Sequence, residues 1–175
     1  MARVRSGDLD AYAELVTRHA PMAVRTATLL GAGTDAEDVV QEAFVKAYRS
    51  LGRFRDGAEL RPWLLRIVAN ETRNHHRASV RRGARERAVA LPAELLDPGE
   101  AVADHEAKER LLAAVAGLPD RLRVVVTCRY LLELDEAETA TTLGLPRGTV
   151  KSRLSRGLAR LRAELVEAGR EADHV

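Results

Sequence analysis

Apolar residues recur at helical spacing through three segments in the N-terminal part of the chain. Residues 9–30, 34–51 and 59–77 each carry an apolar stripe at three- and four-residue intervals, which predicts three amphipathic helices. Thr34 and Glu37 form the pattern of a capping box, so we expect the second helix to begin there. Pro21 predicts a kink or a break in the first helix, because proline lacks the amide donor that a helix interior needs.

A second group of helical segments occupies the C-terminal part. Residues 106–133 again carry apolar positions at helical spacing, and "LDEAETATTLGLPRGTVKSRLSRGLARLR" follows them with the pattern helix, tight turn, helix. Asp135 and Glu138 can cap the first helix of this pair. Gly144 suits a left-handed turn, and Pro146 suits the first turn of the next helix. Together they predict a helix-turn-helix motif.

Between the two groups, residues 83–106 lose clear periodicity and contain Pro92, Pro98 and Gly99, which is typical of a linker. The predicted fold is therefore all-α. It has two small helical domains, 1–82 and 107–175, joined by a flexible linker, and the second domain contains the helix-turn-helix.

The amino-acid composition indicates the character of the core and the cellular compartment. Of the 175 residues 46% are hydrophobic but only 3% are aromatic, so we expect an aliphatic core. The one cysteine, Cys128, lies on an apolar helical face, where we expect it to be buried. A chain with one cysteine forms no internal disulfide, and no apolar run approaches the roughly 20 residues that span a bilayer. We expect a cytoplasmic protein.

Charge is distributed in blocks, although the net charge is only +2. Residues 59–87 hold eight cations and three acids, residues 88–109 one cation and six acids, and residues 146–162 six cations and no acid. Two basic blocks indicate two contacts with a polyanion, most simply nucleic acid, and two solvated helix faces are the alternative.

The second basic block favours DNA contact. On a helical wheel its apolar residues share one face, and the opposite face is small or hydroxylated along its middle and cationic at its sides. Small residues allow close approach to a major groove, where arginine or lysine reads guanine and hydroxyls bond phosphates or base edges. Many regulators carry such a helix, so this motif alone does not separate a simple repressor from part of a larger machine.

The first basic block has a different chemistry. After Trp63 and Ile67 the third helix turns polar, with asparagine, arginine and histidine side chains. Asparagine can bond the Watson–Crick edge of a base, and arginine can hold a phosphate or stack on a base. A second nucleic-acid surface is therefore predicted, and a solvated amphipathic helix is the alternative.

An enzyme is not indicated. The sequence has no glycine-rich phosphate loop and no arrangement of a catalytic triad. His75 and His76 are adjacent and so do not share a helix face, and the paired carboxylates Asp135 and Glu136 are better explained as capping residues. We expect no catalytic residue, no metal and no cofactor.

At this point the motifs match a known family. "TDAEDVVQEAFVKAYRSLGRF", then "RPWLLRIVANETRNHHR", then a linker and "LGLPRGTVKSRLSRGLARLR" resemble the extracytoplasmic-function (ECF) group of the sigma-70 family of bacterial RNA polymerase sigma factors. Their order and spacing agree over roughly residues 8–165. The resemblance implies a first domain that binds core polymerase and the minus-ten promoter element, and a second domain that binds the minus-thirty-five element. An autonomous helix-turn-helix regulator remains the alternative.

The resemblance also implies partners and site residues. The partners are the clamp of the polymerase beta-prime subunit, the beta flap, promoter DNA and an anti-sigma factor. Asn70 matches the residue that reads an extruded minus-ten base. The implied core-binding residues are Asp35, Asp38, Gln41, Glu42 and Phe44. The minus-ten residues are Phe54, Arg55, Asp56, Asn70, Arg73, Asn74 and Arg77, and the minus-thirty-five residues are Arg147, Thr149, Lys151, Ser152, Ser155 and Arg156.

One departure concerns packing. Thr139, Thr141 and Thr142 stand in the first helix of the motif, where the family usually has larger aliphatic side chains. We expect weaker packing there, with less effect on function.

Overall fold

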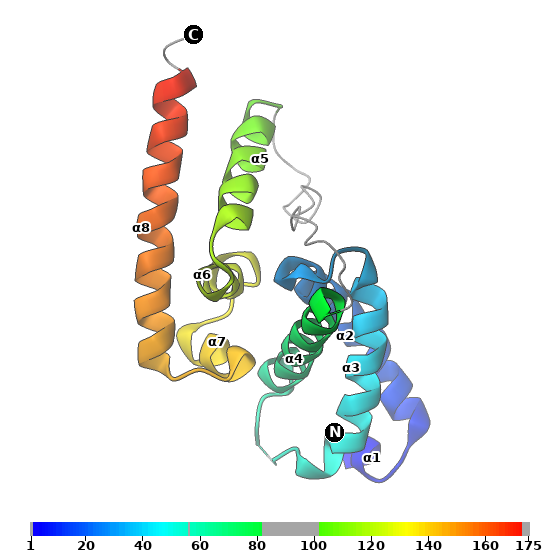
Figure 1. The fold of residues 1–175 in the computed structure, drawn as a ribbon. Helices are drawn as coiled ribbons and strands as arrows, with labels where there is room; N and C mark the ends of the chain where they lie inside the picture. The colour runs from blue at the N-terminus through cyan, green and yellow to red at the C-terminus, as the bar shows by residue number, and fades with distance from the viewer. Residues whose placement is uncertain (1, 56, 82–101, 173–175) are drawn as a thin grey trace. The chain divides into compact units, whose positions relative to one another are not determined.

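The computed structural model describes residues 2–55, 57–81 and 102–172 (Figure 1). All secondary structure in these ranges is helical, as predicted. The chain forms two compact units, one built on helices α1 to α4 and the other on helices α5 to α8. Each unit is described by itself.

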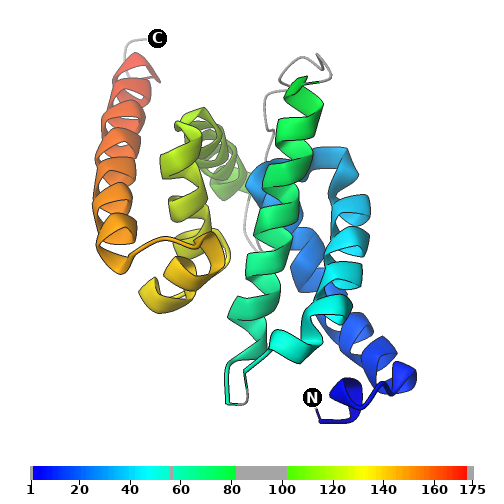
Figure 2. The same cartoon turned by 60° about the horizontal axis from the view of Figure 1, so that its bottom comes forward.

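The first unit packs three long helices around a small-residue core. Its elements are α1 (Ala2–Arg5), α2 (Leu9–Ala27), α3 (Ala36–Ser50) and α4 (Leu60–Arg81). Figure 2 shows α2, α3 and α4 side by side. Alanine, valine, leucine and phenylalanine residues from the three helices fill the space between them: Ala23, Ala27, Val39, Val40, Ala43, Phe44, Ala47, Leu64 and Val68. The predicted third helix, 59–77, is confirmed and extends to Arg81.

Helix α2 begins at a side-chain cap and passes through its proline. The carboxylate of Asp8 accepts a hydrogen bond of 2.9 Å from the backbone N–H of Ala11. The predicted break at Pro21 is absent, because the helix continues to Ala27. The chain changes direction instead at a π-helical turn, Thr28–Ala32, where Gly31 adopts a φ of 103° that side-chain-bearing residues rarely reach.

The predicted capping box at Thr34 and Glu37 is wrong. A 3-10 turn precedes α3, and the capping position is Asp35, whose side chain makes no capping hydrogen bond. Its carboxylate instead lies 2.9 Å from Nε2 of His75 on α4. The Asp35 carboxylate thus binds a residue of α4 and does not cap the N-terminus of α3.

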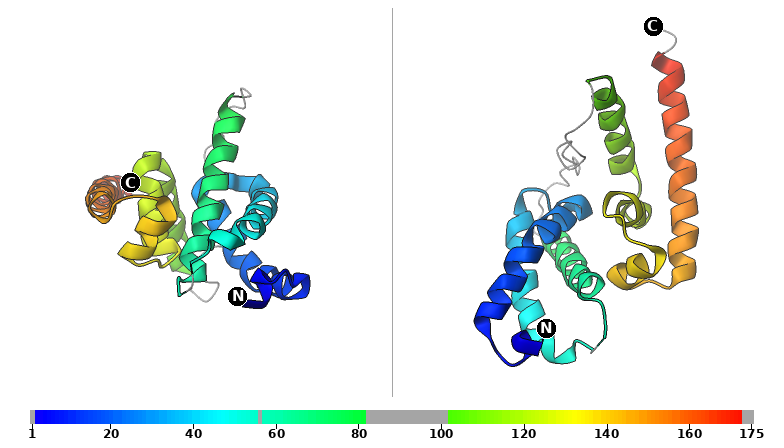
Figure 3. Two further views of the ribbon diagram at one scale, coloured as in Figure 1. Left: turned by 90° about the horizontal axis from the view of Figure 1, so that it is seen from below. Right: turned by 180° about the vertical axis from the view of Figure 1, so that it is seen from behind.

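The second unit holds the helix-turn-helix. Its helices are α5 (Val102–Gly117), α6 (Asp120–Val126), α7 (Glu136–Leu143) and α8 (Arg147–Ala172). Figure 3 shows α8 as one long helix that leaves the short turn after α7. Helix α5 begins inside the predicted linker, 83–106, and the linker residues up to 101 lie outside the described residues.

The turn chemistry predicted for this motif is confirmed. The backbone N–H of Glu138 donates to the Asp135 carboxylate, and the backbone N–H of Asp135 donates to the Glu138 carboxylate, each at 2.8 Å. Gly144 has a φ of 65°, the left-handed value that the turn requires. Pro146 directly precedes α8, and its carbonyl accepts the first amide of the helix interior.

The threonine departure leaves two polar atoms in the core. Thr139 and Thr142 are fully buried, and neither hydroxyl oxygen has a hydrogen-bond partner in the part of the chain that the structure describes. A buried polar group without a partner costs about 1–3 kcal/mol. A larger aliphatic side chain would avoid this cost.

Helices α6 and α8 approach closely at Gly157. A Cβ atom at this position would lie 2.8 Å from Cγ2 of Val126 and 3.8 Å from Cβ of Leu122. Both neighbours are buried, so they have little room to retreat.

We therefore expect Gly157→Ala to destabilise the second unit. Alanine favours a helix over glycine by about 1 kcal/mol, whereas overpacking a core costs about 1–3 kcal/mol. Denaturant unfolding followed by circular dichroism measures the net loss, and hydrogen exchange of α6 and α8 localises it. Gly148→Ala is the matched control, because no heavy atom lies within 4 Å of its Cβ position. Equal stability of the two variants would contradict the close packing.

Cys128 is fully buried in the second unit, as predicted, and burial raises the pKa of its thiol to about 12. Only the thiolate reacts with disulfide reagents, and its fraction falls tenfold for each unit of pKa. We expect Ellman's reagent at pH 8 to modify the folded protein about a thousandfold more slowly than the denatured chain. Comparable rates would show that the thiol is accessible in the folded state.

Candidate polymerase and nucleic-acid interfaces

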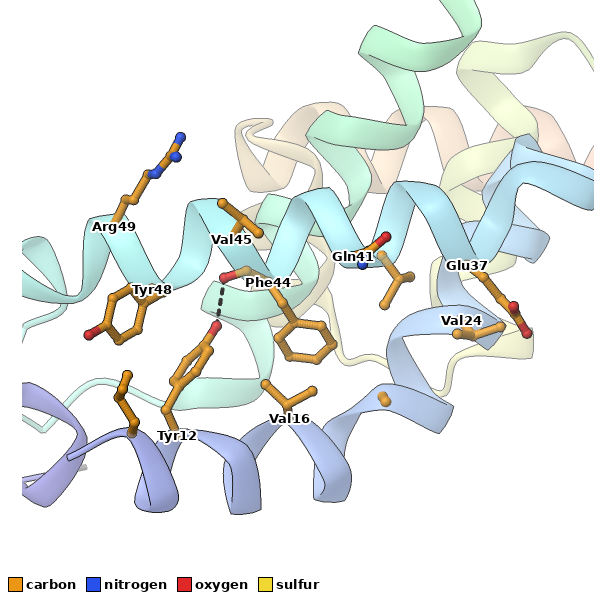
Figure 4. Close-up of a pocket in the computed structure, with 12 residues that line it drawn as sticks. Tyr12, Val16, Val24, Glu37, Gln41, Phe44, Val45, Tyr48 and Arg49 are labelled. Carbon is orange, nitrogen blue, oxygen red and sulfur yellow. Dashed lines mark hydrogen bonds between the residues drawn. The ribbon is translucent and has the colours of Figure 1, made fainter. Parts of the chain in front are cut away.

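An apolar groove of about 780 Å³ runs between α2 and α3 in the first unit (Figure 4). We call it the α2–α3 groove. Its lining comes from both helices: Leu9, Tyr12, Val16, Ala20, Val24, Glu37, Val40, Gln41, Phe44, Val45, Tyr48 and Arg49. Three of the apolar side chains are well exposed, namely Leu9 at 66%, Val45 at 41% and Tyr48 at 38%. Water-exposed apolar side chains grouped on one face indicate a protein-binding surface.

Tyr12 joins the two walls of the groove. Its hydroxyl donates a hydrogen bond of 2.6 Å to the backbone carbonyl of Phe44, drawn as the dashed line in Figure 4. Its ring centroid lies 4.9 Å from that of Tyr48. Burial disfavours the phenolate and raises the pKa of Tyr12 to about 12, so the hydroxyl stays a donor well into alkaline pH. This contact holds the walls together and leaves the apolar surface open.

The predicted core-binding residues occupy different positions around α3. Gln41 lines the groove, and Phe44 forms part of its floor while remaining largely buried in the core. Asp38 and Glu42 are exposed on α3 but do not line the groove. Asp35 lies before the helix and contacts His75.

Sequence reasoning missed most of the groove. The predicted set contains no residue of α2, although Leu9, Tyr12 and Val16 form one of the two walls. It also omits Val45, an apolar residue beside the buried stripe of α3. An apolar residue just outside the buried stripe of a helix, such as Val45, is the sequence pattern that could have predicted this surface.

Four predicted minus-ten residues lie on one face of α4. Asn70, Arg73, Asn74 and Arg77 follow each other at three- and four-residue spacing, which brings their side chains together on a helix. The last three are exposed and Asn70 is partly exposed, whereas Thr72 is buried. The helix therefore presents two amides and two guanidinium groups to solvent.

Side-chain contacts organise this face. Nη1 of Arg73 donates to Oδ1 of Asn70 at 3.0 Å. Glu71 forms an ion pair with Lys46 of α3, so this neighbouring carboxylate is already compensated. The Lys46–Glu71 and His75–Asp35 pairs also tie α4 to α3.

The loop before α4 differs from expectation in one respect. Phe54 is only 6% exposed, and its ring packs edge-on against Trp63 with centroids 5.0 Å apart. In this state the ring secures the loop to α4 and does not offer a stacking surface to a base. Arg55 is exposed, and Asp56 lies outside the described residues.

The third candidate surface is the N-terminal half of α8. Five of the predicted residues are exposed, and Thr149 is half-buried: Arg147, Lys151, Ser152, Ser155 and Arg156 form the exposed set. Val150, Gly157 and Leu161 are buried on the opposite side, so the helix has the two faces that the wheel predicted. The Ser152 hydroxyl donates to the Thr149 carbonyl at 3.1 Å.

The charges on this surface are largely uncompensated. Within the described residues, Lys151 and Arg156 form no ion pair. Arg147 interacts with Asp135, whose pKa is lowered chiefly by the hydrogen bond from the Glu138 amide, with smaller effects from the Ala137 amide, Arg129 and Arg147. Cations without acidic partners on a helix face suit contact with phosphates.

The described residues contain neither a metal-binding cluster nor a membrane-spanning helix. No group of three or more histidine, cysteine or acidic side chains there could hold a metal ion. None of the helices in these ranges has the length and apolar character needed to cross a bilayer.

Two solved structures are similar to this chain. CnrH, solved in complex with the cytosolic domain of CnrY, matches with a TM-score of 0.69 and 28% identity over 95% of this chain and 94% of that chain. The sigma factor RpoE from Bartonella quintana, solved with the anti-sigma factor NepR, has a TM-score of 0.70 and 23% identity over 89% and 96% of the two chains. The second likeness concerns the fold alone.

Sequence comparisons cover both units. The Sigma-70 region 2 family matches residues 15–82, and the Sigma-70, region 4 family matches residues 108–161. The ECF RNA polymerase sigma-E factor of Escherichia coli (strain K12) is 34% identical over 164 residues, which are 88% of this chain and 86% of the relative. That of Haemophilus influenzae (strain ATCC 51907 / DSM 11121 / KW20 / Rd) is also 34% identical, over 88% and 87%. The chain belongs to the ECF group of RNA polymerase sigma factors, which are transcription initiation factors of the sigma-70 family.

Proposed function

We propose that each of the two units recognises a different promoter element. The first unit binds the clamp of core RNA polymerase through the α2–α3 groove and its rim, and reads the minus-ten element with α4. The second unit reads the minus-thirty-five element with α8. The protein acts as a subunit that directs the polymerase and catalyses no reaction itself.

The α2–α3 groove is the single observation that carries this proposal. An autonomous regulator would be expected to add a dimerisation or ligand-binding module to its DNA-reading helix, whereas an open apolar groove between two helices of a separate unit suits the docking of another protein. Here Leu9, Val45 and Tyr48 are exposed beside Glu37 and Arg49, so an apolar centre lies next to charged groups. Protein interfaces commonly combine an apolar centre with a polar rim.

Helix α4 supports the minus-ten role through its chemistry. The amide of Asn70 can form hydrogen bonds with a base that has left the duplex, and the neighbouring cations can hold the phosphates of the opened strand. Extruding a base costs a few kcal/mol, which such contacts offset.

Helix α8 supports the minus-thirty-five role. Its exposed serines permit close approach to the major groove, and Lys151 and Arg156 can reach phosphates or guanine. The capping box of Asp135 and Glu138 and the left-handed Gly144 fix the short connection from which α8 starts.

An anti-sigma factor fits the same surfaces. CnrH has been solved with the cytosolic domain of a second protein, CnrY. We infer that a protein inhibitor of this chain competes with core polymerase, since the exposed apolar side chains of the α2–α3 groove favour protein partners.

Val45→Asp tests the polymerase contact. A carboxylate in the centre of an apolar interface loses its hydration, and a loss of about 1.4 kcal/mol already weakens binding tenfold. We expect the Kd for core polymerase, measured by anisotropy of the labelled protein, to rise at least tenfold. Thr17→Asp is the matched control, because Thr17 is exposed on α2 and does not line the groove. Unchanged binding by Val45→Asp would place the polymerase elsewhere.

Transcription with the unmodified protein tests the proposed function as a whole. The Asn70→Ala variant then tests the minus-ten role of α4. Protein and core polymerase are mixed with a genomic promoter library, and run-off transcripts are sequenced. We expect transcripts that depend on both components. The variant should bind core normally and form closed complexes, but lose open complexes, measured by permanganate reactivity. Tight operator binding without core-dependent transcripts would instead support an autonomous regulator.

A further inference from the structure

We propose that Arg73 orients the amide of Asn70 and thereby sets which bases Asn70 accepts. This inference rests on the proposed minus-ten role of α4. It concerns a positioning residue, because Arg73 acts through the amide of its neighbour.

The contact is local and its chemistry is unambiguous. Arg73 follows Asn70 by three residues on α4, and its Nη1 lies 3.0 Å from Oδ1 of Asn70. A guanidinium group has five donors and no acceptor, so only the oxygen of the amide can face it. The choice between the two amide orientations is thus made by the arginine, and the amide nitrogen faces away from it.

Nearby carboxylates do not draw Arg73 away. Glu71, one residue from Asn70, forms its ion pair with Lys46 of α3. Asp35, the other acid that contacts this part of α4, lies 2.9 Å from Nε2 of His75. Both acids are thus engaged by other cationic or imidazole groups, and Arg73 donates to Asn70.

This orientation has a consequence for base recognition. Asparagine recognises adenine with both ends of its amide, because the oxygen accepts from one adenine nitrogen and the NH2 group donates to another. The Asn70 oxygen has two lone pairs, and the bond from Arg73 uses one of them, which weakens the oxygen as an acceptor and leaves both N–H donors available. Bases whose edges offer carbonyl acceptors, such as the O2 atoms of pyrimidines, then compete better against adenine.

Removing Arg73 should therefore change the base preference as well as the affinity. A bidentate contact discriminates between bases by about 1–3 kcal/mol, roughly 5- to 150-fold. We expect Arg73→Met, in complex with core polymerase, to relax the discrimination against adenine at one minus-ten position about fivefold or more. Arg73→Lys keeps a charged donor and should retain most of the original preference. The measurement is run-off sequencing on promoters randomised across the minus-ten element.

Asn70→Ala, assayed on the same library, identifies the position that the amide contacts. If Arg73→Met lowers transcription equally for all four bases there, Arg73 is a phosphate contact and the inference is overturned. If Asn70→Ala removes selectivity at one position while both Arg73 variants retain it, the orientation is again overturned, but the role of Asn70 stands. If Asn70→Ala changes no position, the proposed minus-ten role itself fails. Core binding and circular dichroism establish that each variant is folded.

Discussion

Close helix packing through small side chains is the constraint on which both units depend. In the first unit, Ala43 and Ala47 of α3 are buried with Ala23 and Ala27 of α2. Small side chains let the backbones of two helices approach each other closely. The larger side chains of the same helices then lie outside this line of contact. In the second unit, Gly157 plays the same part, because α6 leaves no space for even one methyl group there. This close packing fixes the positions of the helices that bear the candidate interfaces.

Helix α3 shows how a single element can serve two partners. Gln41, Val45 and Tyr48 lie along the α2–α3 groove, whereas Lys46 holds α4 by an ion pair and the preceding Asp35 holds it by the contact with His75. The side chains that would meet a protein are therefore different from those that hold the helix proposed to meet DNA. Both sets lie on α3 or directly before it, so this one helix supports the groove and also positions α4.

Local chemistry could be read from the sequence, and contacts between helices could not. The capping box of Asp135 and Glu138 formed as predicted because both partners are three residues apart. The equally good pattern at Thr34 and Glu37 did not form, since α3 is capped one residue later, at Asp35, and His75, forty residues away, engages Asp35. The exposed position of Leu9 and the burial of Phe54 under Trp63 likewise depend on tertiary structure. The helices, the helix-turn-helix and the polar face of α4 follow from periodicity, whereas the α2 wall of the groove does not.

The edge-on packing of Phe54 against Trp63 has a practical consequence. Trp63 is the sole tryptophan of the chain, and it lies at the start of α4 against the loop proposed to approach the minus-ten element. Its indole emission depends on that packing and on the polarity around it. The protein thus carries an intrinsic optical probe beside this loop, and movement of Phe54 can be followed by fluorescence without any attached dye.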